Sequence, residues 1–332
     1  MRRPLRLTGL AVLSAALLVA SGGTAAAAPA LTSNPDAVGH AAAVTGDQHR
    51  QVLDHWTPQR FQAAVPIEAL AGDRLADLPH TGTPAAGAPV AVAPTDPLGS
   101  GAEIQAFPES GAPWTDGGAV VQTSGRVFFD FQGQPASCSG NAVTSANESV
   151  VMTAGHCIKL EGSFHTNWVF VPAYNNGDDP FGTWTGAQSF ITPQWNANEN
   201  INFDIGAMVV NPLGGQQLTD VVGGQGIAFN QPRGLPMYAF GFPAAAPYDG
   251  TRLIYCSGDT FNDPLFSTAI GMTCDMTGGS SGGPWFRSFD EATGTGLQNS
   301  VNSFKYIFLP NAMFGPYFGT DGQNVYNAAQ SA

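Results

Sequence analysis

Residues 277–284 read Thr-Gly-Gly-Ser-Ser-Gly-Gly-Pro, so that five of eight positions are glycine or proline around a central pair of serines. This composition predicts a sharp turn rather than a helix or a strand. A serine hydroxyl is a poor nucleophile at neutral pH, and it needs a base to accept its proton and backbone N–H groups to hold an oxyanion. The glycines beside Ser281 would let the backbone supply such donors. An ordinary surface loop has the same composition, so the rest of the chain decides.

The composition of the whole chain indicates a mainly β protein. Of its 332 residues, 41 are glycine, 25 are proline and only 11% are charged, a mixture that favours many short strands joined by turns. With 43% hydrophobic residues, the chain can fill one large or two modest cores. The net charge of −13 disfavours phosphate binding, which needs clustered lysine and arginine. We therefore expect no nucleic-acid partner.

Short apolar runs bounded by turn residues follow one another from Val120 onward. The break Asn-Pro-Leu-Gly-Gly at residues 211–215 predicts a boundary between two β-barrels, at about 119–212 and about 213–332. In this part of the chain only the tail, about Asp321 to Ala329, predicts a helix. The clearest predicted strands are 127–131, 168–171, 205–210, 238–242, 253–255 and 300–304.

The beginning of the chain has the pattern of a secretory signal peptide. Three arginines precede an apolar run from Leu7 to Ala20, and small residues follow through Ala30. The run, at roughly 14 residues, is too short to span a bilayer comfortably. We predict residues 1–30 as the signal peptide, and a mature protein that is secreted, extracellular and free of the membrane.

Residues 31–118 are rich in alanine, proline and glycine. Their one helix candidate lies around Asp47 to Ala71, and the seven prolines from Pro79 to Pro113 are typical of a linker. We interpret 31–118 as a propeptide plus linker. A permanent N-terminal accessory segment is the alternative, because the sequence has no unambiguous processing signal.

The four cysteines fall into two close pairs whose members are 19 and 18 positions apart. No Cys-x-x-Cys motif indicates zinc binding or redox chemistry. Three connectivities are possible, and two local disulfides are the simplest. We predict the pairs Cys138 with Cys157 and Cys256 with Cys274, which fit an oxidising destination.

A histidine ends an apolar strand at residues 150–157, Val-Val-Met-Thr-Ala-Gly-His-Cys. A disulfide at Cys157 would restrict the backbone of His156, which suits a general base that must be held in one geometry. A lone histidine in such a position is more often structural. The residues described next favour a catalytic role for His156 over a structural one.

A carboxylate enters apolar surroundings at residues 202–209, Asn-Phe-Asp-Ile-Gly-Ala-Met-Val. A buried carboxylate needs a partner, and a histidine N–H would be oriented by it. The other interpretation of Asp204 is an aspartate that caps a strand. Asp178 and Asp179 are rival candidates, but Gly-Asp-Asp-Pro at 177–180 is typical of an exposed turn, and we prefer Asp204.

The order His156, Asp204, Ser281 and the two motifs Thr-Ala-Gly-His-Cys and Gly-Gly-Ser-Ser-Gly-Gly-Pro resemble the chymotrypsin-like serine peptidases. Within that family, residues 274–282 and 170–175 are more similar to the bacterial glutamyl endopeptidase branch than to the trypsins. The resemblance covers about 120–332.

The resemblance implies an all-β fold with two antiparallel β-barrels, an active site in the cleft between them and a short C-terminal helix. It also implies a secreted serine endopeptidase, with residues 119–332 as the peptidase domain and 31–118 making the precursor a zymogen. A polypeptide would be the substrate.

The resemblance assigns a role to each matching residue. Ser281 would be the nucleophile, His156 the general acid and base, and Asp204 the residue that orients the histidine. The backbone N–H groups of Gly279 and Ser281 would form the oxyanion hole. His165 lies outside every motif, and we interpret it as a surface or structural histidine.

The implied substrate-binding residues are Asp275, Ser303 and Phe304. Ser303 and Phe304 correspond to the edge strand that pairs with an extended substrate. Asp275 lies six residues before Ser281, where trypsins bind Arg or Lys, but its Cys-Asp context also occurs in the glutamyl branch. Lys305 is a further candidate, as an acceptor of an acidic side chain.

Two departures from the family pattern affect activation and specificity. Ser280 stands where trypsins have an aspartate, so the ion pair between that aspartate and a new N-terminus cannot form. Residues 301–305, Val-Asn-Ser-Phe-Lys, lack the histidine that glutamyl endopeptidases place near this strand. The preferred substrate residue therefore stays open among acidic, basic and apolar side chains.

No cofactor and no metal are expected for this chemistry. Two adjacent carboxylates at Asp178 and Asp179 are far short of the six to eight oxygens that calcium takes. We expect a monomer. Two alternatives to a serine endopeptidase are a non-catalytic binding module on the same fold and an esterase.

Overall fold

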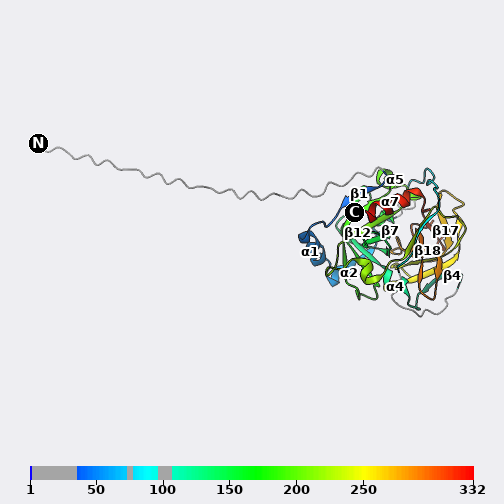
Figure 1. The fold of residues 1–332 in the computed structure, drawn as a ribbon, viewed down its shortest axis with the longest axis horizontal. Coiled ribbons are helices and arrows are strands. Elements are labelled where there is room, and N and C mark those ends of the chain that lie inside the picture. Colours follow the sequence, from blue (N-terminus) through cyan, green and yellow to red (C-terminus); the bar gives the residue numbers. More distant parts are fainter. Residues whose placement is uncertain (2–35, 73–77, 96–106) are drawn as a thin grey trace. The chain divides into compact units, whose positions relative to one another are not determined.

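The computed structural model describes residues 36–72, 78–95 and 107–332, together with Met1. The predicted signal peptide therefore lies outside the described residues. Two β-structures fill the body of the molecule, with α1 on one side and β4 and β17 on the other (Figure 1). None of the helices in the described part of the chain is long and apolar enough to cross a membrane.

The first β-structure is a closed six-stranded barrel. Its sheet runs in the order β11-β10-β5-β6-β7-β12, and β12 pairs with β11 again to close the circle. Two strands from the N-terminal segment join it, β1 beside β11 and β2 parallel to β6. The strands of this sheet are β1 (Val38–Ala41), β2 (Val65–Pro66), β5 (Ser124–Phe131), β6 (Gln134–Val143), β7 (Val150–Thr153), β10 (Thr166–Pro172), β11 (Trp184–Ile191) and β12 (Gly206–Val210).

The second β-structure combines a seven-stranded sheet, in the order β3-β13-β19-β18-β14-β15-β4, with the three-stranded sheet β16-β17-β20. A separate two-stranded ribbon joins β8 to β9. These strands are β3 (Val90–Val92), β4 (Glu109–Pro113), β8 (Lys159–Leu160), β9 (Ser163–Phe164), β13 (Gly226–Phe229), β14 (Pro236–Gly241), β15 (Ile254–Asp259), β16 (Phe261–Asn262), β17 (Ile270–Thr273), β18 (Pro284–Asp290), β19 (Thr295–Val301) and β20 (Ala312–Gly315). The predicted all-β fold of two barrels is confirmed.

The helices are short and lie at the edges of the barrels. The C-terminal helix is confirmed as α7, which packs against β11 and β12 of the first barrel. The helices are α1 (Gly46–His55), α2 (Pro58–Ala63), α3 (Ile67–Ala71), α4 (Ala119–Thr123), α5 (Pro193–Asn198), α6 (Leu218–Val222) and α7 (Thr320–Gln330), with single 3₁₀ turns η2 (Gly155–Cys157) and η3 (Ile201–Phe203).

The prediction of one helix around Asp47 to Ala71 is wrong. The segment forms three short helices, α1, α2 and α3, separated at Trp56 and at β2. Proline explains both breaks, because Pro58 begins α2 at its first position and Pro66 precedes α3. A proline inside a helix removes a backbone donor and restricts the residue before it.

Residues 79–113, predicted as a linker, include two strands of the second sheet. β3 pairs with β13, and β4 pairs with β15. Backbone groups nearer the start of this stretch bind the first barrel, since the N–H of Ile201 donates to the carbonyl of Pro79 at 2.7 Å. The boundary of the mature domain stays a prediction, and these contacts favour a boundary before residue 78.

Large aromatic side chains fill the interiors of the barrels. Trp184 and Trp195 are fully buried within the first barrel cluster, while Trp285 is buried in the second. Burying one such side chain contributes about 2 to 3 kcal/mol. The predicted disulfides are both confirmed, Cys138 with Cys157 and Cys256 with Cys274.

Candidate active site

His156 and Asp204 form a buried pair at the edge of the first barrel. His156 lies in the single turn η2 that follows β7, and Asp204 directly follows η3. One carboxylate oxygen of Asp204 accepts a hydrogen bond from the backbone N–H of His156 at 2.8 Å, and the other lies 2.7 Å from the ring atom Nδ1. Both side chains have an exposed fraction of 0%. The carboxylate thus orients the imidazole through two separate contacts.

The electrostatic surroundings of His156 favour its protonated form. Burial by itself lowers the pKa of the imidazole, but the charge and hydrogen bond of Asp204, with a smaller contribution from Glu68, raise it above its ordinary value. Stabilising the imidazolium is what a general base requires after it has accepted a proton. The same effect means that the free base is lost as the pH falls.

Ser303 completes the surroundings of Asp204. Its hydroxyl donates to Asp204 Oδ2 at 2.5 Å, and its backbone N–H donates to the carbonyl of Phe314 at 3.0 Å. With Nδ1 held by the carboxylate, the other ring nitrogen of His156, Nε2, is buried and has no hydrogen-bond partner among the described residues. The imidazole of His156 is therefore held at Nδ1, and its Nε2 makes no hydrogen bond within the described residues.

The glycine-rich turn lies against the strand that leads to His156. Ser281 is 4% exposed, and its carbonyl accepts from the N–H of Ser139 on β6 at 2.7 Å. Gly282 has a φ of +80°, and a Cβ there would lie 2.0 Å from Thr153 Oγ1 at the end of β7. Gly279 has a φ of +93°. Glycine is required at both positions because other residues rarely adopt this backbone region.

A second carboxylate, which no sequence motif indicates, lies at this turn. Glu68 of α3 accepts a hydrogen bond from the hydroxyl of Ser281 through Oε1. Its other oxygen, Oε2, accepts from the backbone N–H of Gly279 at 3.0 Å. Glu68 lies 213 positions before Ser281 and belongs to no motif, so no local pattern in the sequence indicates the contact.

A pocket of about 220 Å³ opens beside Ser281. Ser303 and Phe304, predicted to bind substrate, both line it, whereas Asp275 is not among the described residues that do. The Asp275 carboxylate instead accepts from the hydroxyl of Tyr248 at 2.6 Å. The pocket wall includes Met276, Thr277, Ser303, Phe304, Lys305 and Met313.

Phe304 and Lys305 each use polar groups within the fold. The backbone N–H of Phe304 donates to the carbonyl of Phe314 at 3.2 Å, and the carbonyl of Phe304 accepts from the N–H of Phe314 at 2.9 Å. The Lys305 ammonium donates to the carbonyls of Cys274 and Pro310 at 2.9 and 2.6 Å. Burial lowers the pKa of Lys305 to about 8, against the opposing effect of Asp275.

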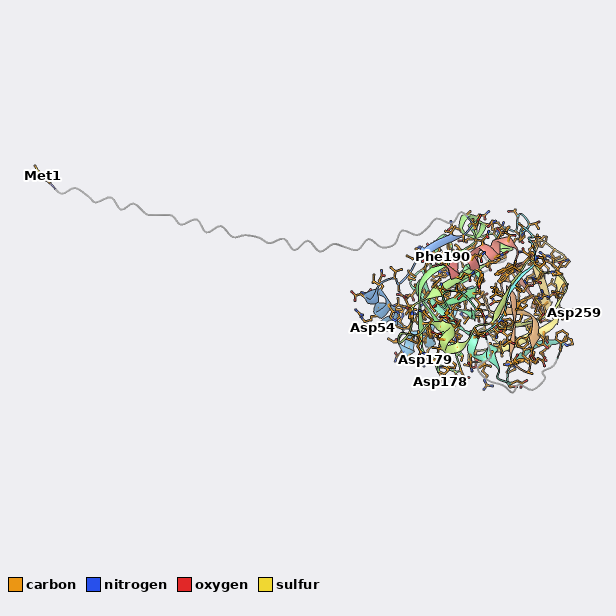
Figure 2. All side chains as sticks on the ribbon, viewed as in Figure 1. Met1, Asp54, Asp178, Asp179, Phe190 and Asp259 are labelled. Atoms are coloured by element: carbon orange, nitrogen blue, oxygen red, sulfur yellow. A yellow bond between two sulfur atoms is a disulfide. The ribbon has the colours of Figure 1, made fainter. Side chains whose placement is uncertain are left out.

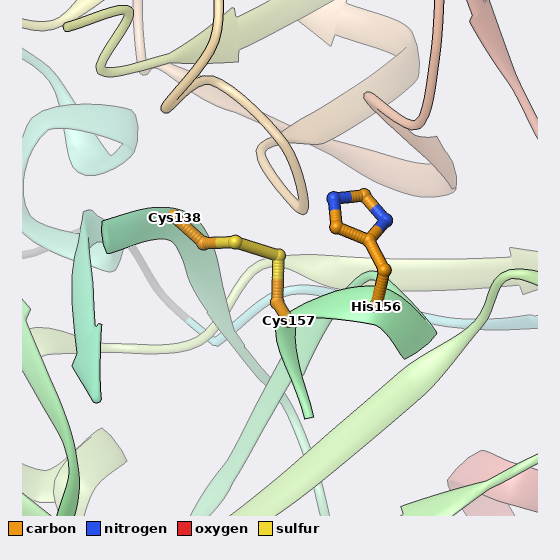
Figure 3. Close-up of side chains that lie close together, drawn as sticks. All are labelled: Cys138, His156 and Cys157. Carbon is orange, nitrogen blue, oxygen red and sulfur yellow. A yellow bond between two sulfur atoms is a disulfide. The ribbon is translucent and has the colours of Figure 1, made fainter. Parts of the chain in front are cut away.

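The disulfide beside the histidine was predicted, and it argues against a metal site. His156 and the bridged Cys138 and Cys157 lie close together at the end of the first barrel (Figure 3). Among the described residues they are the one group of three with metal-ligating side chains. Cysteine binds a metal as its thiolate, but the sulfurs of Cys138 and Cys157 are joined in a disulfide, and His156 Nδ1 is hydrogen-bonded to Asp204. These donors do not fit a metal ion.

Two other sequence expectations concern residues away from the pair. His165 is buried, which favours the structural interpretation over the surface one. Its Nε2 lies 2.8 Å from the carbonyl of His156, and its ring stacks on Phe129. Asp178 and Asp179 lie in an exposed turn, as predicted, and their side chains are at the edge of the molecule (Figure 2). Neither aspartate competes with Asp204.

Comparison with solved structures identifies the family. Protease Anisep from Arthrobacter nicotinovorans is 43% identical in sequence with a TM-score of 0.61, and the match covers 70% of this chain and 100% of that one. The thermostable serine protease AL20, from an extremophilic microorganism, is also 43% identical with a TM-score of 0.61, over 64% of this chain and 99% of that one. The chain belongs to the bacterial chymotrypsin-like serine proteases.

Two weaker similarities are with other proteases. A Glu endopeptidase structure shares the fold at a TM-score of 0.54 and 15% identity, over 68% of this chain and 99% of that one. Among curated proteins, an extracellular metalloprotease of Bacillus subtilis is 26% identical over 192 residues, which are 55% of this chain and 56% of that protein. This chain thus spans about half the length of that relative. No protein-family model matches the chain.

Proposed function

We propose that this serine protease is a secreted endopeptidase that cleaves polypeptides through an acyl-enzyme. The observation that carries the proposal is the buried pair of His156 and Asp204, held by bonds of 2.8 and 2.7 Å, next to the turn that presents Ser281. Buried carboxylate, imidazole and hydroxyl on adjacent elements are the parts that acyl transfer requires. The 43% identity to two serine proteases supports the same reaction.

Each residue has a defined task in the proposed reaction. Ser281 Oγ attacks the substrate carbonyl carbon while its proton passes to His156 Nε2, and Asp204 stabilises the resulting imidazolium. The backbone N–H groups of Gly279 and Ser281 hold the oxyanion of the tetrahedral intermediate. His156 then gives its proton to the leaving amine, and water, activated by the same imidazole, releases the acyl group from Ser281. No metal takes part in these steps.

The pocket beside Ser281 is the proposed site for the substrate side chain that precedes the cleaved bond. Met276, Phe304 and Met313 supply apolar walls, and Thr277 and Lys305 supply polar groups. The Lys305 ammonium already donates to two backbone carbonyls, which makes it a weaker candidate for binding an acidic substrate side chain. The apolar walls favour a substrate side chain that is largely hydrophobic.

Secretion is part of the proposal. The two disulfides fit an oxidising compartment, since cytosolic thiols are kept reduced. The predicted signal peptide at residues 1–30 supports the same destination. The relative from Bacillus subtilis is likewise named as extracellular.

The testing experiment is digestion of a diverse peptide library by the processed protein, with cleavage sites identified by mass spectrometry. A Ser281→Ala variant, purified in the same way, is the matched control. We expect cleavage by the wild-type protein that is lost in the variant by a factor of about 10³ or more.

Other outcomes would select a different function. Equal cleavage by both proteins would exclude Ser281 as the nucleophile. No cleavage of peptides, together with hydrolysis of small esters that depends on Ser281, would favour the esterase. No hydrolysis of either by a folded, processed sample would favour the binding module.

A further inference from the structure

The Glu68 carboxylate occupies the positions that the substrate and the catalytic base need. Oε2 accepts from the N–H of Gly279 at 3.0 Å, so it lies where a substrate oxyanion would receive that bond. Oε1 accepts the proton of the Ser281 hydroxyl. The hydroxyl has one proton to donate, and it is directed at Glu68 instead of at His156.

The state of His156 agrees with this geometry. Its Nε2, which must receive the Ser281 proton in the reaction, is buried and has no hydrogen-bond partner in the described ranges. The charge of Glu68 is also among the causes that raise the pKa of His156. The hydroxyl proton of Ser281 is therefore directed to Glu68 and not to His156, and the charge of Glu68 favours the protonated histidine, which cannot act as a base.

The segment that carries Glu68 is anchored on the first barrel by backbone pairing. β1 is antiparallel to β11 and pairs with it from Val38 to Ala41. β2 runs parallel to β6 immediately before α3. Ile67, next to Glu68, is fully buried. These contacts restrict where the following side chain can lie, and they direct Glu68 into the cleft.

A buried charge cluster adds a second anchor. Asp130 on β5 has a side chain only 5% exposed, and its oxygens lie 2.8 Å from Arg60 Nη2 of α2 and 2.8 Å from His55 Nε2 of α1. The indole N–H of Trp56 donates to the carbonyl of Asn167 at 2.6 Å. A buried carboxylate requires such partners, so the barrel is complementary to this segment.

We infer that the N-terminal segment is an intramolecular inhibitor whose inhibitory group is the Glu68 carboxylate. The inference rests on the proposed function, because it concerns the same Ser281. It also offers an activation route that does not need the ion pair of the trypsins. That ion pair cannot form here, because Ser280 stands in place of the aspartate, and its hydroxyl donates to the carbonyl of Thr277 at 2.8 Å. Activation is the departure of Glu68 from the oxyanion hole.

The test measures how fast Ser281 reacts in the uncleaved full chain. A fluorophosphonate probe labels an activated serine, and only the full-length band on a denaturing gel is quantified at early times. The chains compared are wild type, Glu68→Ala, Glu68→Gln and a control, Asp54→Asn, which removes an exposed acid from α1 of the same segment (Figure 2). Processed wild-type protein serves as the fully active reference.

We expect Glu68→Ala to be labelled about 10- to 100-fold faster than the full-length wild type, the effect of losing a charged hydrogen-bond acceptor. Glu68→Gln should lie between the two, because its amide oxygen still accepts from Gly279 but carries no charge. Asp54→Asn should match the wild type. Circular dichroism checks that each chain is folded, and Glu68→Gln, which keeps the side-chain size, supplies the result if the alanine variant does not fold.

Two results would overturn the inference, and they are distinguishable. If processed protein is labelled rapidly while full-length wild type and both Glu68 variants are labelled at one common rate, the inference fails and the proposed function stands. If processed protein is not labelled either, Ser281 is not an activated nucleophile and both fail.

Discussion

The two halves of the candidate active site differ in where the hydrogen-bond partners of their polar groups come from. In the half that holds the proposed base, the Asp204 carboxylate receives hydrogen bonds from His156 and Ser303, which are both buried. In the half that holds the proposed nucleophile, Ser281 and Gly279 donate to Glu68, which comes from the N-terminal segment.

This difference follows from the tasks of the two halves. The base must be held in one orientation throughout the reaction, and fixed internal partners achieve that. In the proposed reaction the donors of the nucleophile turn must be available to a substrate, and in the described part of the chain the Gly279 N–H and the Ser281 hydroxyl both donate to Glu68. An unpaired buried donor is costly, and a carboxylate delivered by another segment satisfies both donors until substrate replaces it.

The largest expected effect comes from breaking the base half at Asp204. An Asp204→Asn variant keeps the size of the side chain but can donate to His156 Nδ1, which would leave the ring in the wrong tautomer. We expect kcat of the processed protein on a peptide substrate to fall about 10³- to 10⁴-fold, with a much smaller change in KM.

Ser303→Ala is the matched control for that change, because it removes one bond to the same carboxylate and leaves the carboxylate itself. Its loss in kcat should be only about tenfold, the effect of one hydrogen bond. Equal losses in the two variants would show that the pair is a structural unit rather than the base.

The next largest effect concerns the backbone of the nucleophile half. In Gly282→Ala the new Cβ would lie 2.0 Å from Thr153 Oγ1 and 2.4 Å from the carbonyl of Ser139, at a φ of +80°. Overpacking and backbone strain together should lower the free energy of unfolding by about 3 kcal/mol or more. The turn must also move away from β7, so activity should be lost, as measured with the processed protein.

Gly133→Ala separates strain from overpacking. Gly133 has nearly the same φ, +83°, but no atom within 4 Å of the new Cβ. We expect about 1 kcal/mol of destabilisation from the backbone alone and unchanged activity. If urea unfolding gives the same loss for both variants, the close packing of Gly282 against the first barrel is not what fixes the turn.

Local features of the sequence were sufficient to single out the proposed base and nucleophile, whose roles stay predictions. The apolar strand ending in His156, the apolar surroundings of Asp204 and the glycine-rich turn at Ser281 each carry a signal within ten residues. The same holds for the strands and both disulfides, whose partners lie 19 and 18 positions apart. Motifs, strands and disulfides that depend on residues close in sequence can be predicted from a single chain.

Contacts across long sequence separations could not be predicted in this way. Glu68 is 213 positions from Ser281, and Arg60 is 70 positions from Asp130. Nothing in the sequence near either residue distinguishes it from an exposed charge on a short helix. Likewise, β3 becomes a strand because β13 offers it an edge, and its surroundings, rich in proline and alanine, predicted only a linker.

The smallest expected effect concerns His165, the buried histidine that contacts the backbone of His156. The ring of His165 lies 2.8 Å from the carbonyl of His156, and burial lowers the pKa of His165 to about 3, a direction that the charge of His156 reinforces and the backbone bond opposes. The ordinary pKa is 6.5, so between these two values the unfolded chain binds a proton that the folded chain does not. Stability is therefore present above pH 6.5 and is lost as the pH falls.

We expect the free energy of unfolding to decrease by about 1 kcal/mol per pH unit in this window because of His165 alone. Urea unfolding at pH 7, 5 and 4, in a Ser281→Ala background that prevents self-digestion, measures the slope. His165→Gln keeps a polar group for the carbonyl, and His165→Phe keeps the stack on Phe129. Because both variants remove the titrating ring, both should lose less stability on acidification than the reference, whatever they lose at pH 7. An unchanged slope in both would show that burial of the His165 ring is not what makes the protein less stable in acid.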